Sequence, residues 1–228
     1  MAETWLLLNS GPGAPADNMA WDEALLLSVA RLGAPVLRFY GWTQAAASFG
    51  YFQRIAEIEI WTALRPLIRR PTAGGLVPHE MDWTYSLVFP RLHWWFDLRA
   101  EESYRRLHEW IQDAFARVKL ATELAPRGDK TAPGQCFAGP EKFDLVARGE
   151  KIAGAAQRRT REGMLIQGSI QPLPPGVTRA AWERAMGESA ESRFGVAWKT
   201  LEPDSELQRL AASLSAEKFS RDSFNRRR

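Results

Sequence analysis

Short runs of apolar residues, separated by glycine, proline and small polar residues, occupy the first part of the chain. Two of these runs, VLRFYGW and AASFGYFQ, are rich in aromatic and β-branched residues, which favour extended backbone. The pattern therefore predicts strands. They are expected at residues 4–9, at 36–42 and 46–53 as two adjacent strands, and from Leu67 and Trp83 onward.

Further along, apolar side chains recur at intervals of three and four residues, which predicts an amphipathic helix at 101–120. Its stripe consists of Tyr104, Leu107, Ile111, Phe115 and Val118, which we assign to the core and to no other role. An earlier helix is expected at 17–32, with Asp17 as its N-cap and Gly33 after its end. Shorter helices are expected near 55–64, 178–187 and 204–215.

The runs 143–147 and 152–157 flank Arg148-Gly149-Glu150-Lys151, a pattern typical of a hairpin, and 164–170 predicts a third strand. Strands and helices therefore intermix, and the chain shows no internal repeat or low-complexity linker. This organisation favours one α+β domain over residues 1–216, followed by a basic C-terminal tail at 217–228.

Composition narrows the functional classes. The chain has 228 residues, 45% of them hydrophobic, and ten tryptophans, enough for one substantial core. Its net charge of +3 arises entirely in residues 217–228, which we interpret as a frayed, solvated tail, so no nucleic-acid surface is indicated. The N-terminus has no signal-peptide or membrane-span pattern, and a single cysteine favours the cytoplasm, so we expect a cytoplasmic protein without a membrane partner.

That single cysteine, Cys136, falls in a loop at 126–142 that contains three prolines and three glycines. Lys130, Lys142 and Lys151 lie nearby in the sequence and would favour a thiolate, as acyl transfer from a thioester requires. An inert, half-buried thiol fits the sequence equally well. The residues alone leave both readings open.

Lys151 precedes Ala153, Gly154, Ala155 and Ala156, whose small side chains leave room for a ligand or another backbone to approach. A lysine there can hold a carbonyl oxygen or a phosphate as a point charge. Taken alone, a solvated hairpin lysine is the commoner situation.

A second candidate is the loop from Arg69 to His79, in which Arg69 and Arg70 are followed by Gly74 and Gly75. Guanidinium groups and glycine amides could bind a carboxylate, a phosphate or a thioester carbonyl. The loop matches neither a Walker loop nor a dinucleotide fingerprint. His79 at its end is interpreted as a structural hydrogen-bonding group.

The sequence contains no pattern typical of a metal site or of a Ser-His-Asp catalytic triad. The three histidines, His79, His93 and His108, lack metal-ligand spacing, and the cysteine has no CxxC partner, so no metal site is predicted. A Ser-His-Asp triad is also not predicted, because GxSxG is absent.

Six ordered blocks from about Glu3 to Pro172 together resemble the lipoate–protein ligase A and octanoyltransferase superfamily. The blocks are NSG…NMAWDEALL, PVLRFYGW, FGYFQ, RRPTAGGLVPHE…TYSLV, CF…FDLVARGEKIAGAAQRR and QGSI. The resemblance implies an α+β catalytic domain of the biotin/lipoate ligase type, with mixed sheets packed against helices. It also sets aside the solvated-lysine reading of Lys151.

Within that superfamily, Cys136-Phe137 and the run WTYS resemble the cysteine-dependent octanoyltransferases. The resemblance implies that Cys136 accepts the acyl group, that Lys151 contacts the acyl carbonyl, and that no cofactor is needed. The implied substrate-binding residues are Arg70, Gly74, Gly75, His79, Ala153, Gly154 and Ala155. The implied partners are octanoyl-acyl carrier protein and a lipoyl carrier domain, such as the glycine cleavage H protein or a 2-oxoacid dehydrogenase E2.

Three residues depart from the family pattern: Ala73 replaces a usual glycine, Gly75 stands where transferases often have arginine and ligases have glycine, and Gln167 replaces a histidine. An ATP- and Mg-dependent lipoate–protein ligase is therefore the alternative. The chain ends soon after the last block, which favours the transferase but also allows a split ligase. A non-catalytic protein that binds an acyl group or a lipoyl domain is the third hypothesis.

Overall fold

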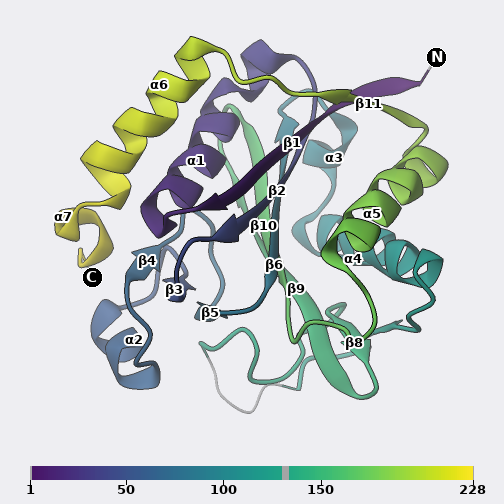
Figure 1. Cartoon of the computed structure of the whole chain (residues 1–228), viewed down its shortest axis with the longest axis horizontal. Coiled ribbons are helices and arrows are strands. Elements are labelled where there is room, and N and C mark those ends of the chain that lie inside the picture. Colours follow the sequence, from purple (N-terminus) through teal and green to yellow (C-terminus); the bar gives the residue numbers. More distant parts are fainter. Residues whose placement is uncertain (1, 130–133, 228) are drawn as a thin grey trace.

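The computed structural model describes residues 2–129 and 134–227. Within these residues, a mixed eight-stranded sheet lies between two groups of helices, as Figure 1 shows. Across the sheet, the strands are β11 (Val196–Thr200), β1 (Glu3–Gly13), β2 (Val36–Trp42), β6 (Trp83–Pro90), β10 (Gly163–Ile170), β9 (Glu150–Arg159), β8 (Leu145–Ala147) and β7 (Glu123–Leu124). The first three are parallel, and every pair from β2 onward is antiparallel.

A smaller sheet in the described residues has the order β4 (Leu67–Arg69), β3 (Ala46–Phe49) and β5 (Val77–His79). The prediction that 36–42 and 46–53 form adjacent strands is therefore wrong in its pairing. β2 already has β1 and β6 on its two edges, so no hydrogen-bonding edge remains for β3. β3 instead pairs with β4 and β5. The loop from Arg69 to His79, called the glycine-containing loop below, belongs to this smaller sheet.

The helices are α1 (Pro15–Leu32), α2 (Ile55–Trp61), α3 (Trp94–Asp97), α4 (Ala100–Arg117), α5 (Arg179–Phe194), α6 (Ser205–Leu214), the π-helical turn η1 (Ser215–Phe219) and α7 (Asp222–Asn225). Every predicted helix is present: α1 and α5 are longer than predicted and α2, α4 and α6 are slightly shorter, while α3, η1 and α7 were not predicted. The N-cap of α1 is Ala14 rather than Asp17, because Pro15 occupies the first helical turn. The helix predicted near 178–187 continues to Phe194, where Gly195 ends it in the left-handed conformation.

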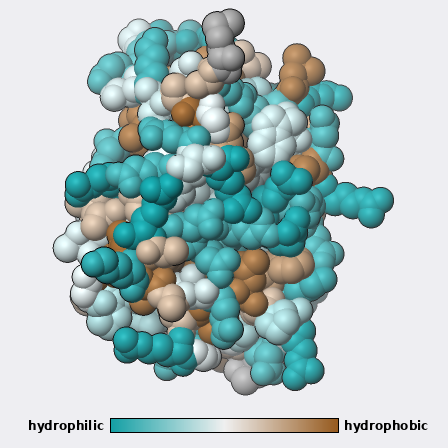
Figure 2. Space-filling model, turned by 90° about the vertical axis from the view of Figure 1, so that its right-hand side faces the viewer, coloured by the Kyte–Doolittle hydropathy of each residue, from teal (hydrophilic) through white to brown (hydrophobic). Residues whose placement is uncertain are grey.

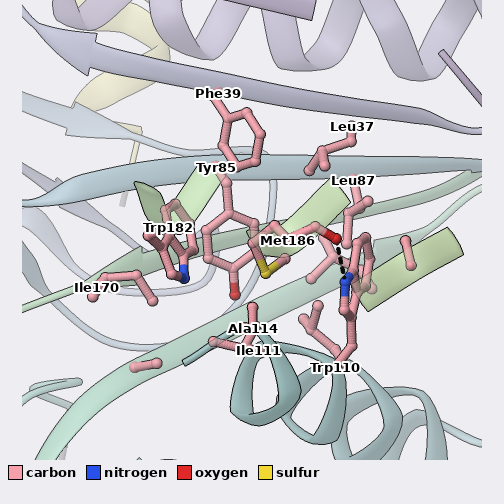
Figure 3. Close-up of a cluster of buried hydrophobic side chains, with 14 of the residues drawn as sticks. Leu37, Phe39, Tyr85, Leu87, Trp110, Ile111, Ala114, Ile170, Trp182 and Met186 are labelled. Carbon is pink, nitrogen blue, oxygen red and sulfur yellow. Dashed lines mark hydrogen bonds between the residues drawn. The ribbon is translucent and has the colours of Figure 1, made fainter. Parts of the chain in front are cut away.

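Neighbouring residues on the central strands face opposite helix layers, as strand geometry requires. Val36, Val88 and Leu165 pack beneath α1, whereas Leu37 and Leu87 pack beneath α4 and α5. Figure 3 shows the second cluster, where Trp182 and Met186 of α5 meet Trp110 and Ile111 of α4 over the sheet. The indole N–H of Trp110 donates to the Met186 carbonyl at 2.8 Å, so this large aromatic core also satisfies a buried donor.

The basic tail was interpreted as solvated, which holds for its exposed charged residues but is wrong for Phe219, Phe224 and Asn225. Phe219 and Phe224 are buried against Met19 and Tyr40. Asn225 is buried as well, and its side-chain oxygen accepts the backbone N–H of Arg69 at 2.9 Å. The prediction counted only the charges of this segment. Its apolar side chains, which lie between the charged ones, pack against the domain.

The surface outside these contacts is largely polar. Figure 2 shows one side of the molecule as mainly hydrophilic, with apolar side chains scattered among charged ones. No helix in residues 2–129 and 134–227 is long and apolar enough to cross a membrane.

His108 of α4 makes the fold sensitive to acid. Burial lowers its pKa from 6.5 to about 4, so the folded protein holds it neutral. The unfolded chain then binds more protons, and the free energy of unfolding should fall as the pH drops from 6.5 toward 4. We expect His108→Phe, which keeps an aromatic ring in place, to remove about 3 kcal/mol of this pH dependence in denaturant unfolding. Parallel plots of unfolding free energy against pH for the wild type and His108→Phe would contradict this prediction.

Candidate active site

A pocket of about 400 Å³ opens between the glycine-containing loop, β9, β10 and the start of α4. This volume is within the range of small-molecule sites. Seven predicted site residues line it, namely Arg70, Gly74, His79, Cys136, Lys151, Gly154 and Ala155. Gly75 lies behind the lining and contacts the cysteine through its backbone. Ala153 is fully buried in the larger core cluster, so the structure does not bring it to the pocket.

The Cys136 sulfur lies at the edge of the glycine-containing loop and is half-buried. The backbone N–H of Gly75 donates to it at 3.1 Å. The Arg70 guanidinium lies beside the same sulfur: burial lowers the pKa of Arg70, and its interaction with Cys136 opposes that shift. The sulfur therefore has a backbone amide donor and a buried guanidinium beside it.

The loop that carries Cys136 is held by backbone pairing with the glycine-containing loop. Leu76 N–H donates to Gly134 O at 2.7 Å, and Cys136 N–H donates to Leu76 O at 2.9 Å. A Cβ atom at Gly75 would lie 2.3 Å from the Gly134 carbonyl oxygen. This approach explains the departure at Gly75, because an arginine there could not coexist with this pairing.

Lys151 is a residue of β9, not of the hairpin turn where the sequence placed it. The turn between β8 and β9 is Arg148-Gly149 alone, with φ of 53° and 82°, the left-handed values of a tight hairpin. The Lys151 ammonium is buried, lies 2.6 Å from the Asp144 carboxylate and donates to the Cys136 carbonyl oxygen at 2.5 Å. Its contact with the Cys136 backbone joins the two predicted catalytic residues.

Gly154 provides the space for this lysine. A Cβ at Gly154 would lie 2.8 Å from Lys151 Cε and Nζ. The small residues after Lys151 were predicted to leave room for a ligand or a backbone. At Gly154 the room is taken by the Lys151 side chain itself, which folds back over the strand.

Asp144 and Tyr104 are site residues that the sequence did not identify. Asp144 is fully buried and accepts hydrogen bonds from the Tyr104 hydroxyl and from Glu141 N–H, the latter at 2.6 Å. The assignment of Tyr104 to the core alone is wrong, since it lines the pocket and its oxygen accepts Ala155 N–H at 3.3 Å. Burial, together with Asp144, raises the pKa of Tyr104 well above its ordinary value. An acidic residue within the apolar run FDLV was the available signal.

The two arginines of the predicted anion-binding loop have different surroundings. Arg69 points away from the pocket and donates to the carbonyl oxygens of Phe224 and Asn225 in the C-terminal segment. Arg70 is buried, and its guanidinium donates to Ala73 O at 2.9 Å and Gly75 O at 2.6 Å. Only Arg70 lines the pocket, and it braces the loop from inside.

His79 takes part in an arrangement that sequence motifs did not indicate. Its Nδ1 lies 2.9 Å from Asp82, and its Nε2 lies 2.8 Å from the Ser48 hydroxyl. The three residues therefore form a Ser-His-Asp hydrogen-bonded series without a GxSxG motif, because they come from β3, β5 and the turn after β5. The interpretation of His79 as a hydrogen-bonding group agrees with these contacts.

Gln167, another of the three departures from the family pattern, is hydrogen-bonded on both sides of its amide. Its side-chain oxygen accepts Thr72 O–H at 2.7 Å, and its N–H donates to Asp22 at 2.7 Å. Asp22 is fully buried and also pairs with Arg38 of β2 at 2.7 Å. Gln167 thus connects α1 to the glycine-containing loop with one donor and one acceptor.

The remaining sequence expectations have mixed outcomes. Lys142 lies at the pocket rim, where it is half-exposed and pairs with Glu101 at 2.5 Å, and Lys130 lies outside the described residues. Tyr40 and Trp42 line the pocket, whereas Phe39 is in the core and Phe52 is exposed. The described residues contain no group of His, Cys, Asp and Glu that could hold a metal ion.

The fold is that of lipoate–protein ligase catalytic domains. A structure of lipoate–protein ligase A bound with ATP matches with a TM-score of 0.79 at 20% identity over 99% of each chain. A bipartite lipoate protein ligase from Thermoplasma acidophilum matches with a TM-score of 0.72 at 19% identity, over 99% of this chain and 96% of that one. These likenesses confirm the predicted α+β architecture.

The chain belongs to the lipoyl protein ligase A/B catalytic domain family, whose model matches residues 14–171. Octanoyltransferase LipM of Bacillus subtilis is 38% identical over 182 residues, and LipM of Staphylococcus aureus is 37% identical over 183 residues. The Bacillus alignment covers 74% of this chain and 65% of the relative, so the chain spans just under two thirds of that relative's length. The resemblance read from the six blocks is confirmed.

Gly75 provides a test of the loop pairing. We expect Gly75→Ala to push Gly134 away and to lower the free energy of unfolding by about 1–3 kcal/mol, as overpacking against backbone does. The displaced loop should also expose Cys136, and its thiol should react faster with Ellman's reagent. Gly187→Ala is the control, because its added Cβ would make an ordinary contact at 3.5 Å with Trp198. Equal effects of the two changes would contradict the pairing model.

Proposed function

We propose that this protein transfers an octanoyl group from a carrier-protein thioester to a lysine of a lipoyl carrier domain, through an acyl-enzyme at Cys136. The observation that carries the proposal is the Cys136 sulfur inside the pocket, with the Gly75 N–H at 3.1 Å and Arg70 beside it. The identity with octanoyltransferases named LipM supports the same reaction class. The donor would be octanoyl-acyl carrier protein, and the acceptor would be the H protein or an E2 domain.

The reaction has two balanced steps. The Cys136 thiolate attacks the thioester carbonyl carbon, a new C–S bond forms, and the donor's C–S bond breaks to release its thiolate, which takes up a proton. The acceptor lysine, as a neutral amine, then attacks the Cys136 thioester. An amide forms, Cys136 leaves as thiolate, and the proton lost by the amine passes to solvent, which balances the proton that the donor thiolate took up. Exchange between thioesters is nearly isoenergetic, so the proposed first step needs neither ATP nor a metal.

Lys151 would stabilise the charge that develops on the carbonyl oxygen. Its ammonium is fixed by Asp144 at 2.6 Å and already contacts the Cys136 backbone. A preorganised cation near a developing oxyanion acts mainly on the transition state. Asp144 and Tyr104 would then be positioning residues, since they hold the lysine and need not contact the acyl group.

Tyr40, Trp42 and Met19 would contribute apolar surface for the acyl chain. Each buried methylene contributes about 0.8 kcal/mol, so an octanoyl chain could supply about 5 kcal/mol of binding before ordering costs.

An ATP-dependent lipoate ligase is the second candidate, and Gly75 is the observation that favours it, because ligases carry glycine at that position. In that case Lys151 and Arg70 would contact a carboxylate and a phosphate. The contacts of Arg70 favour the transferase, since its guanidinium already binds two carbonyl oxygens and a hydroxyl.

Acylation of Cys136 distinguishes the two candidates. After incubation with octanoyl-acyl carrier protein and apyrase, the intact mass of the wild type should increase by one octanoyl group, while Cys136→Ser should be unchanged. Carrier octanoylation by Cys136→Ser at the wild-type rate would refute the covalent mechanism. Modification that requires free lipoate and ATP would establish the ligase.

Lys151→Met should lower kcat by about 10²–10³-fold, as the loss of an oxyanion donor does. Lys151→Arg should rescue poorly, because a planar guanidinium cannot fit over Gly154. The deciding measurement is the single-turnover rate of Cys136 acylation. Since Asp144 would be left buried and unpaired, Lys151→Met is also compared with the double variant Lys151→Met/Asp144→Asn. Acylation at the wild-type rate in either would remove Lys151 from the mechanism.

A further inference from the structure

The buried series Asp82, His79, Ser48 and Arg70 is not used by the proposed acyl transfer. Asp82 Oδ2 lies 2.9 Å from His79 Nδ1, and His79 Nε2 lies 2.8 Å from Ser48 Oγ. Ser48 Oγ in turn lies 3.1 Å from Arg70 Nη1. Ser48, His79 and Arg70 are each less than 5% exposed. The series therefore connects a buried carboxylate to a buried guanidinium through two side chains.

The chemistry of the two charged groups fixes the direction of the hydrogen bonds at both ends of the series. A guanidinium only donates, so Ser48 Oγ accepts from Arg70. Ser48 Oγ also hydrogen-bonds to His79 Nε2, and His79 Nδ1–H donates to the Asp82 carboxylate. Hydrogen bonds aligned in this way polarise and strengthen one another.

The far end of the series leads to the cysteine. Arg70 Nη2 donates to the carbonyl oxygens of Ala73 and Gly75, at 2.9 and 2.6 Å. The N–H of Gly75 donates to Cys136 Sγ at 3.1 Å. Arg70 thus holds the carbonyl side of the residue whose amide faces the sulfur. A change in the position of the guanidinium would move that amide.

The acidic end is held rigidly. Besides His79, Asp82 accepts from Thr84 Oγ1 at 2.9 Å and from Ser169 Oγ at 2.7 Å. Burial raises the pKa of Asp82, but His79, Ser169 and Thr84 outweigh burial and lower it overall, so the carboxylate stays charged. Trp42 stacks on His79 with ring centroids 3.9 Å apart, which fixes the imidazole plane.

We propose that Asp82, His79 and Ser48 form a positioning relay that orients Arg70, and through it the Gly75 amide, toward the Cys136 sulfur. The relay deepens the proposed function, because it concerns the nucleophile of that reaction. It assigns the three residues to thiolate stabilisation and not to a separate serine nucleophile, since the Ser48 oxygen is already bound by Arg70. Among the described residues, the other charged groups that line the pocket with Cys136 are Lys151, which pairs with Asp144, and Glu101, Glu141 and Lys142.

Alkylation of the purified protein by iodoacetamide tests the relay without any acyl donor. The chain has one cysteine, so the reaction reports on Cys136 alone. We expect Ser48→Ala to slow alkylation at neutral pH about tenfold, which corresponds to an increase of about one unit in the pH midpoint of the reaction. Ser48→Thr keeps the hydroxyl and should restore the rate.

Asp82→Asn gives the sharper test, because a purely electrostatic effect and loss of the relay predict opposite changes in the alkylation rate. Removing a negative charge near the site would by itself favour the thiolate and speed alkylation. Loss of the relay would instead remove the support that orients the Arg70 guanidinium. We therefore expect slower alkylation of Cys136, with the pH midpoint of the reaction at a higher pH.

Ser86→Ala is the matched control, because it deletes an equally buried hydroxyl that donates to another carboxylate, Asp22, at 2.6 Å. Near-UV circular dichroism identifies any variant that fails to fold. If Ser48→Ala or Asp82→Asn fails to fold, Ser48→Thr and Asp82→Glu are compared with Ser86→Ala instead. Rates for Asp82→Asn and Ser48→Ala within twofold of Ser86→Ala would overturn the relay, as would faster alkylation of Asp82→Asn. Either result would overturn the relay without affecting the proposed acyl transfer, because acylation of Cys136 by octanoyl carrier protein is measured separately.

Discussion

The backbone pairing of Leu76 with the loop around Gly134 and Cys136 is the contact on which the site depends. It brings together two loops about 60 positions apart in the chain and sets the sulfur against the Gly75 amide. The pairing requires a residue without a side chain at Gly75, since a Cβ would lie 2.3 Å from the Gly134 oxygen. Any larger residue, including the arginine expected from the family pattern, is incompatible with this geometry, and Arg70, which directly follows β4, places its guanidinium beside the sulfur.

Around this pairing, the site consists of buried charges that are each compensated. Lys151 pairs with Asp144, and Arg70 is joined to Asp82 through Ser48 and His79. An unpaired buried charge typically destabilises a fold by about 3–5 kcal/mol, so each charge fixes its partner's position. Rigid placement of the Lys151 ammonium suits a role in transition-state stabilisation, because little reorganisation is needed when charge develops.

The sequence predicted local structure well wherever one segment sufficed. The apolar runs located β2, β6 and β10, and the stripe of α4 follows its spacing. Pairing was harder: β3 looked like the neighbour of β2, yet both edges of β2 were already occupied. Tyr104 has the spacing of a core residue but is only half-buried, and its hydroxyl reaches Asp144, 40 positions away, a distance that no local pattern encodes.

The sequence by itself determined the family, the lone thiol, the lysine after the hairpin and the glycines of the loop, because these depend on residue type and short spacing. The tertiary structure alone decided which groups meet. It directed Arg69 to the C-terminal segment and Arg70 to the cysteine, and it assembled Ser48, His79 and Asp82 from separate strands and a turn. The physical reason is that hydrogen bonds and ion pairs act over a few ångströms in space, whereas sequence patterns report only neighbours along the chain.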